Sequence, residues 1–570
     1  MGFDVEMNAR APALEERFVG SLRANGLSKA WSFIGSNGFL VCICLIGIVL
    51  RAVVYLHGRS FWTDEAQLAL NIRSRSISDL FGKLDYCQAA PPGFLVVEKY
   101  LATGFGDSEL VLRFLPFVAG VCAVVIFAVL ARQILATRAA ALSVTLFALS
   151  EALIRYSTEF KQYSVDVFFA LLIWLTALPS LSSGTQKGHH FKLTAFLAVI
   201  APWFSFASIL VIPAILCAGS ATALKQKDRG SILKCLALWG LFGASVSLVY
   251  VLSLSGVSCG PCKNALMDER AVPPHELTAI GWFANKVFDV MAFPGGFIPL
   301  ATGIALLCLL IGFWQLRQKR PAETMALCLP IALAAGGAWL SIYPFFGRFL
   351  LFVVPVILVL VAEGVQWLNS KINGKRAAWI SACIVLLLLW PRLDFVRWKG
   401  DRTTFHETEV KGAIEYIGKN RQPGEVIYVY YGAYFPAKYY CRAAGIGEDE
   451  LTIGIPGYWW NSELRDTLLK AWEKTAPAEA KPKEEVFASY SRGDFSPQWA
   501  AFESDVKRLA GKGRVWFLFS LTKWLGSDEE KVFLHFLDKH GHWLKTKRLS
   551  GASVYLYEFP KVLGKSKKAG

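Results

Sequence analysis

Two adjacent carboxylates, Asp64 and Glu65, stand out in the stretch 57–92, HGRSFWTDEAQLALNIRSRSISDLFGKLDYCQAAPP. This stretch follows the first long apolar run of the chain and precedes another apolar segment. Carboxylates at the mouth of a membrane helix are costly unless they are hydrated or used. The pair therefore predicts a general base that acts on an acceptor hydroxyl. The alternative is a helix N-cap at Thr63 or Asp64, and both interpretations can hold together.

A second polar group lies in YSTEFKQYSVD, which contains Glu159, Lys161, Tyr163 and Asp166. Asp166 is expected just inside a membrane span, where a charge costs about 2.5–3.5 kcal/mol on insertion scales unless it faces a cavity. Asp166, or failing it Glu159, is therefore a candidate second acidic residue. The alternative is structural, with Glu159 paired to Lys161 or capping a helix end.

Arg348 is the only basic residue in the apolar stretch IYPFFGRFLLFVVP, close to the turn at Tyr343. A guanidinium there can hold a phosphate group by forked hydrogen bonds. The alternative is that Arg348 extends its charged end to the lipid headgroups. The residues predicted to contact substrate are Glu65, Gln88, Lys161, Tyr163, Tyr343 and Arg348.

Cys259 and Cys262 lie in a polar loop, SCGPC, with no second CxxC or His pair nearby. A complete zinc site needs four ligands, so a structural disulfide is favoured, since the loop is expected in an oxidising space. Catalytic redox chemistry is the alternative. The eight His lack metal-ligand spacing, and no Gly-rich phosphate motif is present. The residues themselves therefore indicate no metal site, no nucleotide and no cofactor.

The composition indicates a polytopic helical membrane protein. The 570 residues are 54% hydrophobic and only 18% charged, whereas ordinary soluble domains are about 25% charged. The net charge of +16 could suggest nucleic-acid binding. The Lys and Arg residues, however, are scattered in short loops between apolar runs, which is the pattern that orients membrane helices.

The distribution of Lys and Arg also predicts the topology. Residues 1–32 are expected in the cytoplasm, and residues 33–392 are expected to form about eleven spans of bilayer length. Segment 91–104 is expected at the membrane surface, within an outer loop 57–108. If this segment spanned instead, every Lys- or Arg-rich short loop would face outward, against the positive-inside rule.

Residues 393–570 are predicted to form an α/β domain outside the cytoplasm, because their composition is charged and interrupted by Pro and Gly. Runs of aromatic and β-branched residues predict strands, and apolar residues at helical spacing predict helices. The predicted strands are 426–431, 514–520 and 554–559, the helices are 408–420 and 529–540, and a loop is predicted at 475–485.

Four stretches together resemble the GT-C superfamily of glycosyltransferases that use polyprenyl-phosphate sugars. They are FWTDEA, PPGFLVVEKYLATGFGDSELVLRFLPFVAG, YSTEFKQYSVDVFFALLIW and YPFFGRFLLFVVP. The chain is most similar to bacterial members of the protein O-mannosyltransferase-like family, which includes lipid A aminoarabinose transferases and lipopolysaccharide-core transferases. The resemblance implies an inverting hexosyl or pentosyl transfer from a polyprenyl-phosphate donor to an envelope glycan, lipid or protein.

By the same resemblance, Asp64 would be the base or would orient the acceptor, Asp166 or Glu159 would be the second acidic residue, and Arg348 would hold the lipid phosphate. The location implied is the bacterial inner membrane, with the C-terminal domain on the periplasmic side. Relatives often carry His, Glu or Lys directly before the Pro-Pro pair, where these residues contact metal or phosphate. This chain has 88–90, QAA, at that place, which cannot supply a charged contact and argues against both a divalent metal and a phosphate contact from that loop.

A transporter or lipid flippase is the alternative function. Such a protein is expected to carry internal repeats and charged or broken helices near the bilayer midplane. The ionisable residues of this chain concentrate instead at the predicted outer ends of spans. A non-catalytic scaffold would leave the predicted grouping of Asp64, Asp166 and Arg348 without an explanation.

Overall fold

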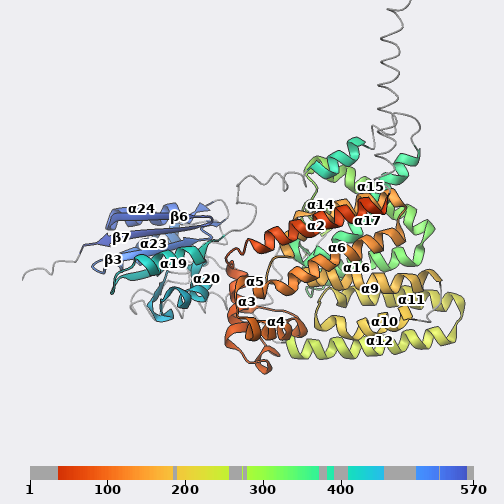
Figure 1. Ribbon diagram of the computed structural model, residues 1–570, viewed down its shortest axis with the longest axis horizontal. Coiled ribbons are helices and arrows are strands. Elements are labelled where there is room, and N and C mark those ends of the chain that lie inside the picture. Colours follow the sequence, from red (N-terminus) through yellow and green to blue (C-terminus); the bar gives the residue numbers. More distant parts are fainter. Residues whose placement is uncertain are drawn as a thin grey trace, which may run out of the picture.

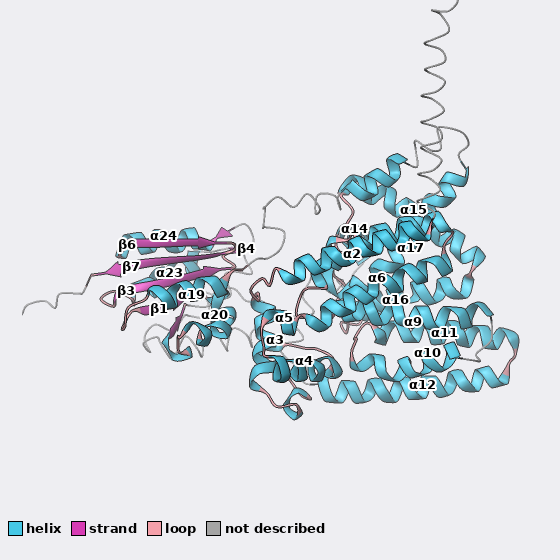
Figure 2. Ribbon diagram, viewed as in Figure 1, coloured by secondary structure: helices cyan, strands magenta, loops and turns pink. Residues whose placement is uncertain are grey.

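The computed structural model describes residues 36–183, 189–255, 273, 279–371, 382–390, 408–454, 496–524 and 527–560. These residues form a body of long helices and a smaller domain that contains a sheet (Figures 1 and 2). The predicted cytoplasmic segment 1–32, the predicted loop 475–485, and Cys259 and Cys262 all lie outside the described residues.

The described residues contain eight helices that are long and apolar enough to cross a membrane. They are α2 (Asn37–Leu56), α6 (Phe114–Ile134), α9 (Tyr163–Ser183), α11 (Ser208–Gln226), α12 (Arg229–Val249, continued to Leu254), α15 (Pro299–Lys319), α16 (Pro321–Trp339) and α17 (Val354–Lys371, preceded by a 3-10 helix over Gly347–Val353). Shorter helices are α7 (Thr137–Ala148), α8 (Glu151–Tyr156), α10 (His189–Ile200) and α14 (Ala279–Ala292). The last predicted span, 377–391, is described only over residues 382–390.

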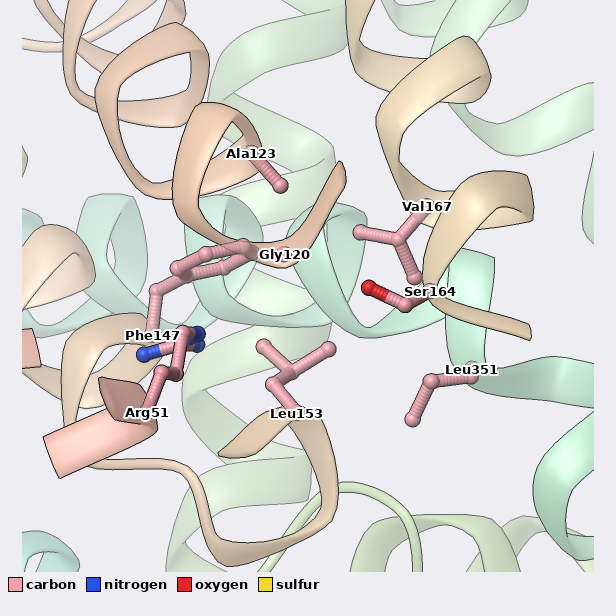
Figure 3. Close-up of a pocket in the computed structure, with 8 residues that line it drawn as sticks. All are labelled: Arg51, Gly120, Ala123, Phe147, Leu153, Ser164, Val167 and Leu351. Carbon is pink, nitrogen blue, oxygen red and sulfur yellow. The ribbon is translucent and has the colours of Figure 1, made fainter. Parts of the chain in front are cut away.

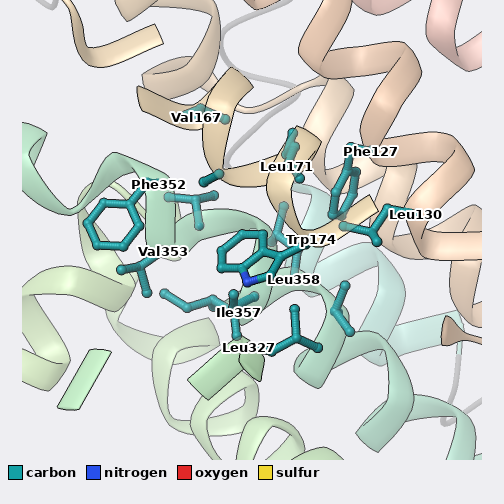
Figure 4. Close-up of a cluster of buried hydrophobic side chains, with 14 of the residues drawn as sticks. Phe127, Leu130, Val167, Leu171, Trp174, Leu327, Phe352, Val353, Ile357 and Leu358 are labelled. Carbon is teal, nitrogen blue, oxygen red and sulfur yellow. The ribbon is translucent and has the colours of Figure 1, made fainter. Parts of the chain in front are cut away.

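The core of the helical domain lies between α6, α9, α16 and α17. Trp174 of α9 is fully buried there, among side chains of α6, α16 and α17 (Figure 4). Its indole Nε1 donates to the carbonyl of Ala326 at 3.1 Å. Helices α15 and α17 cross closely: a Cβ on Gly364 would lie 1.9 Å from the carbonyl oxygen of Cys308. Small residues permit such approaches between membrane helices.

Three helices cover the end of the bundle that faces the smaller domain: α3 (Thr63–Ser74), α4 (Pro92–Phe105) and α5 (Glu109–Leu112) (Figure 1). Helix α4 has 14 residues, fewer than the approximately 20 that a span requires. Trp62 is the N-cap of α3, so neither Thr63 nor Asp64 caps this helix. The side chain of Glu65 reaches back to the Trp62 amide at 3.4 Å, which leaves Asp64 in the first turn without a capping role.

The C-terminal domain contains a five-stranded sheet in the order β2-β1-β3-β7-β6. Strands β2 (Leu451–Ile453), β1 (Val426–Val429) and β3 (Gly513–Ser520) are parallel, while β7 (Ala552–Phe559) and β6 (His542–Leu549) pair antiparallel. A separate two-stranded antiparallel sheet pairs β4 (Lys523–Trp524) with β5 (Ser527–Asp528). The helices are α19 (Val410–Asn420), α20 (Tyr434–Tyr440), α23 (Ser496–Lys507) and α24 (Glu529–His540).

The predicted α/β domain is therefore confirmed, and each of the three predicted strands overlaps an observed one. Strands β2 and β6 were not predicted. β2 has only three residues, and β6 is exposed along most of its length. An exposed edge strand lacks the apolar alternation by which a half-buried strand is recognised.

Candidate active site

Asp64 lies at the centre of a charged cluster built from four separate parts of the chain. Its Oδ1 accepts a hydrogen bond from Lys161 Nζ at 3.0 Å and one from Gln88 Nε2 at 3.1 Å. Its Oδ2 lies 2.8 Å from Nη1 of Arg348. The Lys161 ammonium also donates to the side-chain oxygen of Gln88. Four of the residues predicted from the sequence are thus in contact with one another.

The two cations determine the protonation of Asp64. Burial by itself raises the pKa of the Asp64 carboxyl, but the charges of Lys161 and Arg348 outweigh burial and hold the pKa well below its ordinary value. Asp64 is therefore ionised in the resting site. It is also a weak proton acceptor for as long as both cations remain paired with it.

Arg348 is the more accessible of the two cations. Its side chain is 24% exposed, compared with 5% for Lys161. The guanidinium also lies over the rings of Trp62, Tyr163 and Phe349, with centroid distances of 5.6, 5.3 and 5.6 Å. These cation–π contacts hold the guanidinium in place while it remains open to a ligand.

Glu65 faces a different set of partners from those of Asp64. Its carboxylate accepts two hydrogen bonds from Arg113, at 2.8 and 2.6 Å, and one from the Phe160 amide at 2.7 Å. Arg59 lies 3.6 Å away, and Glu65 is completely buried. Burial raises the pKa of Glu65, but the two arginines lower it below the ordinary value. Glu65 therefore fastens α3 to the segment before it and to the loop before α9.

The two candidates for the second acidic residue have different surroundings. Glu159 is completely buried, and neither of its carboxylate oxygens has a hydrogen-bond partner. Burial and then the charge of Glu65 raise the pKa of Glu159. Asp166 accepts a hydrogen bond from the Ser205 hydroxyl at 2.6 Å and one from the Ala207 amide at 3.2 Å. These bonds place the Asp166 carboxylate at the turn before α11.

The remaining predicted contacts, Tyr163 and Tyr343, lie around Arg348. Tyr163 packs edge-on against Phe349, with centroids 5.8 Å apart. The Tyr343 hydroxyl donates to the carbonyl of Phe349 at 2.8 Å. Both tyrosines thus contact the residue that follows Arg348 in the chain, and both help to fix the backbone that carries the guanidinium.

The C-terminal domain holds the residues directly before Asp64, a role that the sequence analysis missed. The Phe61 amide donates to the Tyr440 hydroxyl at 2.8 Å, and the Thr63 hydroxyl donates to the carbonyl of Gly432 at 3.0 Å. The Ser60 hydroxyl donates to Glu409 at 3.1 Å. The aromatic residues at the end of α20 were the only sequence signal for this contact, and such residues are typical of any hydrophobic core.

A small cavity inside the helical domain lies next to Arg51 and Ser164 (Figure 3). Its other lining residues, such as Phe147, Leu153 and Leu351, are apolar. The Arg51 guanidinium donates to the carbonyls of Gly47 and Ala148, at 2.9 and 3.2 Å. None of the residues predicted to contact substrate lines this cavity, so it is separate from the Asp64 cluster.

A divalent metal does not fit at Asp64. Within the described ranges, no group of three or more His, Cys, Asp or Glu side chains could hold a metal ion. The Asp64 carboxylate is already paired with Lys161 and Arg348. A metal cation bound to the Asp64 carboxylate would be repelled by the charges of both Lys161 and Arg348.

The predicted disulfide between Cys259 and Cys262 falls outside the described residues. Cys87, in the loop after α3, is disulfide-bonded. The other nine described cysteines are free. The sequence analysis did not single out Cys87.

No family model and no curated protein matches this chain. Among solved structures, ArnT from Cupriavidus metallidurans in the apo state is 12% identical with a TM-score of 0.50, and the match covers 91% of this chain and 98% of that one. The chain shares the fold of ArnT. This agrees with the fold expected from the sequence, a GT-C-like helical membrane domain followed by a small α/β domain.

Two further structures are similar at lower scores. ArnT from Cupriavidus metallidurans bound to undecaprenyl phosphate is 12% identical, with 91% of this chain and 98% of that chain covered and a TM-score of 0.49. The archaeal oligosaccharyltransferase AglB from Archaeoglobus fulgidus, in complex with an inhibitory peptide and a dolichol-phosphate, is 13% identical, with 91% and 74% covered and a TM-score of 0.44.

Proposed function

We propose that this protein is a membrane glycosyltransferase that moves a sugar from a polyprenyl-phosphate donor to an acceptor hydroxyl, with inversion at the anomeric carbon. The observation that carries the proposal is the position of Asp64 between Lys161 and Arg348, at 3.0 and 2.8 Å. Two cations suit a phosphate leaving group, and a carboxylate beside them suits an acceptor hydroxyl. The site thus brings together the groups that this transfer requires, at the predicted outer ends of the spans.

The donor phosphate competes with Asp64 for the two cations. Arg348, the more exposed cation, receives the phosphate first, and Lys161 follows. Asp64 then loses the charges that hold its pKa down, so the pKa of its carboxyl rises and the carboxylate becomes a better base. Binding of the donor therefore activates the group that the chemistry requires.

The transfer itself is a single displacement. The acceptor oxygen attacks the anomeric carbon while its proton passes to Asp64, and the bond from that carbon to the phosphate oxygen breaks. The bonding electrons leave with the phosphate, whose added charge Arg348 and Lys161 stabilise. Attack on the side opposite the leaving group inverts the configuration.

We assign the second acidic role to Glu159 and keep Asp166 as the alternative. Both carboxylate oxygens of Glu159 are buried without a hydrogen-bond partner, in the loop that also carries Lys161. The hydrogen bonds of Asp166 go instead to the turn before α11. Glu65, held by Arg113, positions the first turn of α3 and therefore Asp64 beside it.

The C-terminal domain and the Asp64 cluster belong on one side of the membrane, because the two are joined by hydrogen bonds at Phe61 and Thr63. The positive-inside pattern supports the extracytoplasmic side. The location proposed is the bacterial inner membrane. The acceptor is an envelope glycan, lipid or protein, and the sugar is a hexose or pentose.

The test uses Arg348→Ala in the purified full-length protein. We expect weaker binding of undecaprenyl phosphate and slower transfer of labelled sugar, with Arg348→Lys restoring only part because an ammonium lacks the planar fork. Arg320→Ala is the matched control, since Arg320 is an arginine at a helix end that is 40% exposed and pairs with Glu323.

Normal lipid binding by Arg348→Ala would contradict the phosphate role. The enzyme assignment itself would fail if vesicles containing the wild-type protein moved labelled lipid between leaflets without forming a new glycosidic bond. That second result would identify a flippase.

A further inference from the structure

A chain of side-chain amides runs from Lys161 to Gln67 beside Asp64. The Lys161 ammonium can only donate hydrogen bonds, and it donates to the side-chain oxygen of Gln88. The nitrogen of Gln88 therefore faces the other way and donates to Asp64 Oδ1 at 3.1 Å and to Gln67 Oε1 at 2.8 Å. A donor-only lysine and an acceptor-only carboxylate thus fix the orientation of the Gln88 amide.

The orientation of Gln88 fixes that of Gln67 in turn. The Gln67 oxygen is used by Gln88, which leaves the Gln67 NH₂ group to face away from it. This nitrogen is buried and has no hydrogen-bond partner, while the residue is only 4% exposed. Buried donors in native proteins nearly always have a partner, so an unpaired one beside the Asp64 cluster is consistent with a water or a ligand oxygen as its partner.

Gln67 is also held in the right place to meet substrate. It lies three residues after Asp64 in α3, a spacing that puts two side chains on the same helix face. Its backbone carbonyl accepts from Asn71 Nδ2 at 2.9 Å, and the same Asn71 group donates to Asp85 at 3.2 Å. Helix α3 and the loop that carries Gln88 are therefore joined on both sides of Gln67.

We propose that the Gln67 amide is a substrate-binding group that donates a hydrogen bond to a substrate oxygen next to Asp64. This inference rests on the proposed function. The ligand atom is a hydrogen-bond-accepting oxygen, supplied by the donor phosphate or by the acceptor hydroxyl. A phosphate oxygen would gain a neutral donor in addition to the cations Lys161 and Arg348.

An acceptor hydroxyl would be oriented completely by this arrangement. Its proton points to Asp64, one lone pair accepts from Gln67, and the remaining lone pair is free to attack the anomeric carbon. Orientation of a nucleophile in this way contributes to rate because the reacting atoms are held in line before the step begins.

The test is Gln67→Met, which keeps the length of the side chain and removes both polar atoms. The matched control is Gln366→Met, since Gln366 accepts from the Ala139 amide in the helical domain and lies outside the Asp64 cluster. Transfer by each variant is measured as labelled sugar that passes from undecaprenyl phosphate to acceptors in membranes of a strain that lacks the gene. Binding is measured separately with undecaprenyl phosphate and the purified full-length protein.

We expect Gln67→Met to lower transfer by about 10- to 100-fold, as loss of a hydrogen bond to a charged or reacting group does, with thermal stability close to wild type. Weaker binding of undecaprenyl phosphate identifies the phosphate as the ligand. Unchanged binding with slower transfer identifies the acceptor hydroxyl. Normal transfer together with normal binding would overturn the proposal.

Two further outcomes separate this inference from its alternatives. If Gln67 only held Gln88 against Asp64, the acid limb of the pH profile of transfer would move to higher pH in Gln67→Met, while the rate of transfer above that limb stayed at the wild-type value; that result would overturn the substrate contact. If wild-type protein transfers no sugar, the proposed function fails. The lipid-binding measurement then decides on Gln67 alone: weaker binding in Gln67→Met supports the contact, and unchanged binding refutes it.

Discussion

Asp64→Asn is expected to change the two halves of the reaction in opposite directions. In the resting site the Asp64 carboxylate occupies the cations that the donor phosphate needs, at 3.0 Å from Lys161 Nζ and 2.8 Å from Arg348 Nη1. The asparagine keeps the shape of the side chain but removes the charge. Donor phosphate should therefore bind more tightly to this variant, although the variant has lost its base.

The size of the binding effect follows from Coulomb's law. Two unit charges about 4 Å apart interact by about 1 kcal/mol in bulk water and by about 4 kcal/mol near a protein surface. Because Arg348 is 24% exposed, solvent screening favours the lower part of that range. A gain of about 1–2 kcal/mol corresponds to roughly 5- to 30-fold tighter binding of undecaprenyl phosphate.

Transfer should fall by about 10²–10⁴-fold in the same variant, because that is the usual cost of losing a general base. Binding is measured by titration with undecaprenyl phosphate, and transfer by incorporation of labelled sugar. Asp107→Asn is the matched control, since Asp107 is 38% exposed and pairs with Arg73 away from the cluster.

Each half of this expectation can be refuted separately. Weaker binding of undecaprenyl phosphate by Asp64→Asn would mean that the carboxylate and the phosphate do not compete for the same cations. Near-normal transfer would mean that the base is another residue, and Glu159 and then Asp166 would be tested next.

Three other outcomes are expected. Glu65→Gln should lower the free energy of unfolding by about 3–5 kcal/mol, because it leaves the buried charge of Arg113 unpaired; a denaturation midpoint equal to wild type would contradict this. Tyr440→Phe should slow transfer several-fold without changing the binding of undecaprenyl phosphate, because it removes the hydroxyl that accepts from the Phe61 amide. An equal loss of lipid binding would mean that Tyr440 also supports the phosphate site. Cys87 should resist alkylation until the protein is reduced, and peptide mapping of its partner would also decide the disulfide predicted between Cys259 and Cys262.

The amino-acid sequence by itself predicted the fold class, a helical membrane domain followed by a small α/β domain. Apolar runs such as Phe114–Ile134 are recognisable because a bilayer requires about 20 apolar residues in succession. Strands β1, β3 and β7 were predicted because their buried aromatic and β-branched residues differ from everything around them. Asp64 was singled out on energetic grounds, since a carboxylate beside a membrane helix is rarely placed there without a use.

Only the tertiary structure decided which groups meet. Lys161 is 97 positions from Asp64 in the sequence, and no local pattern states that the two are in contact. The adjacent Asp64 and Glu65 received opposite roles, because successive side chains on a helix point about 100° apart. One carboxylate faces Lys161 and Arg348, and the other faces Arg113.

The same reason explains why Gln67 and Tyr440 were missed. A glutamine within a predicted helix and a tyrosine within an aromatic run are ordinary in sequence. They stand out only when packing brings Gln88 against Gln67 and the Phe61 amide against the Tyr440 hydroxyl. Hydrogen bonding between segments far apart in the chain is set by how the helices and the sheet domain pack, and the local sequence carries no record of that packing.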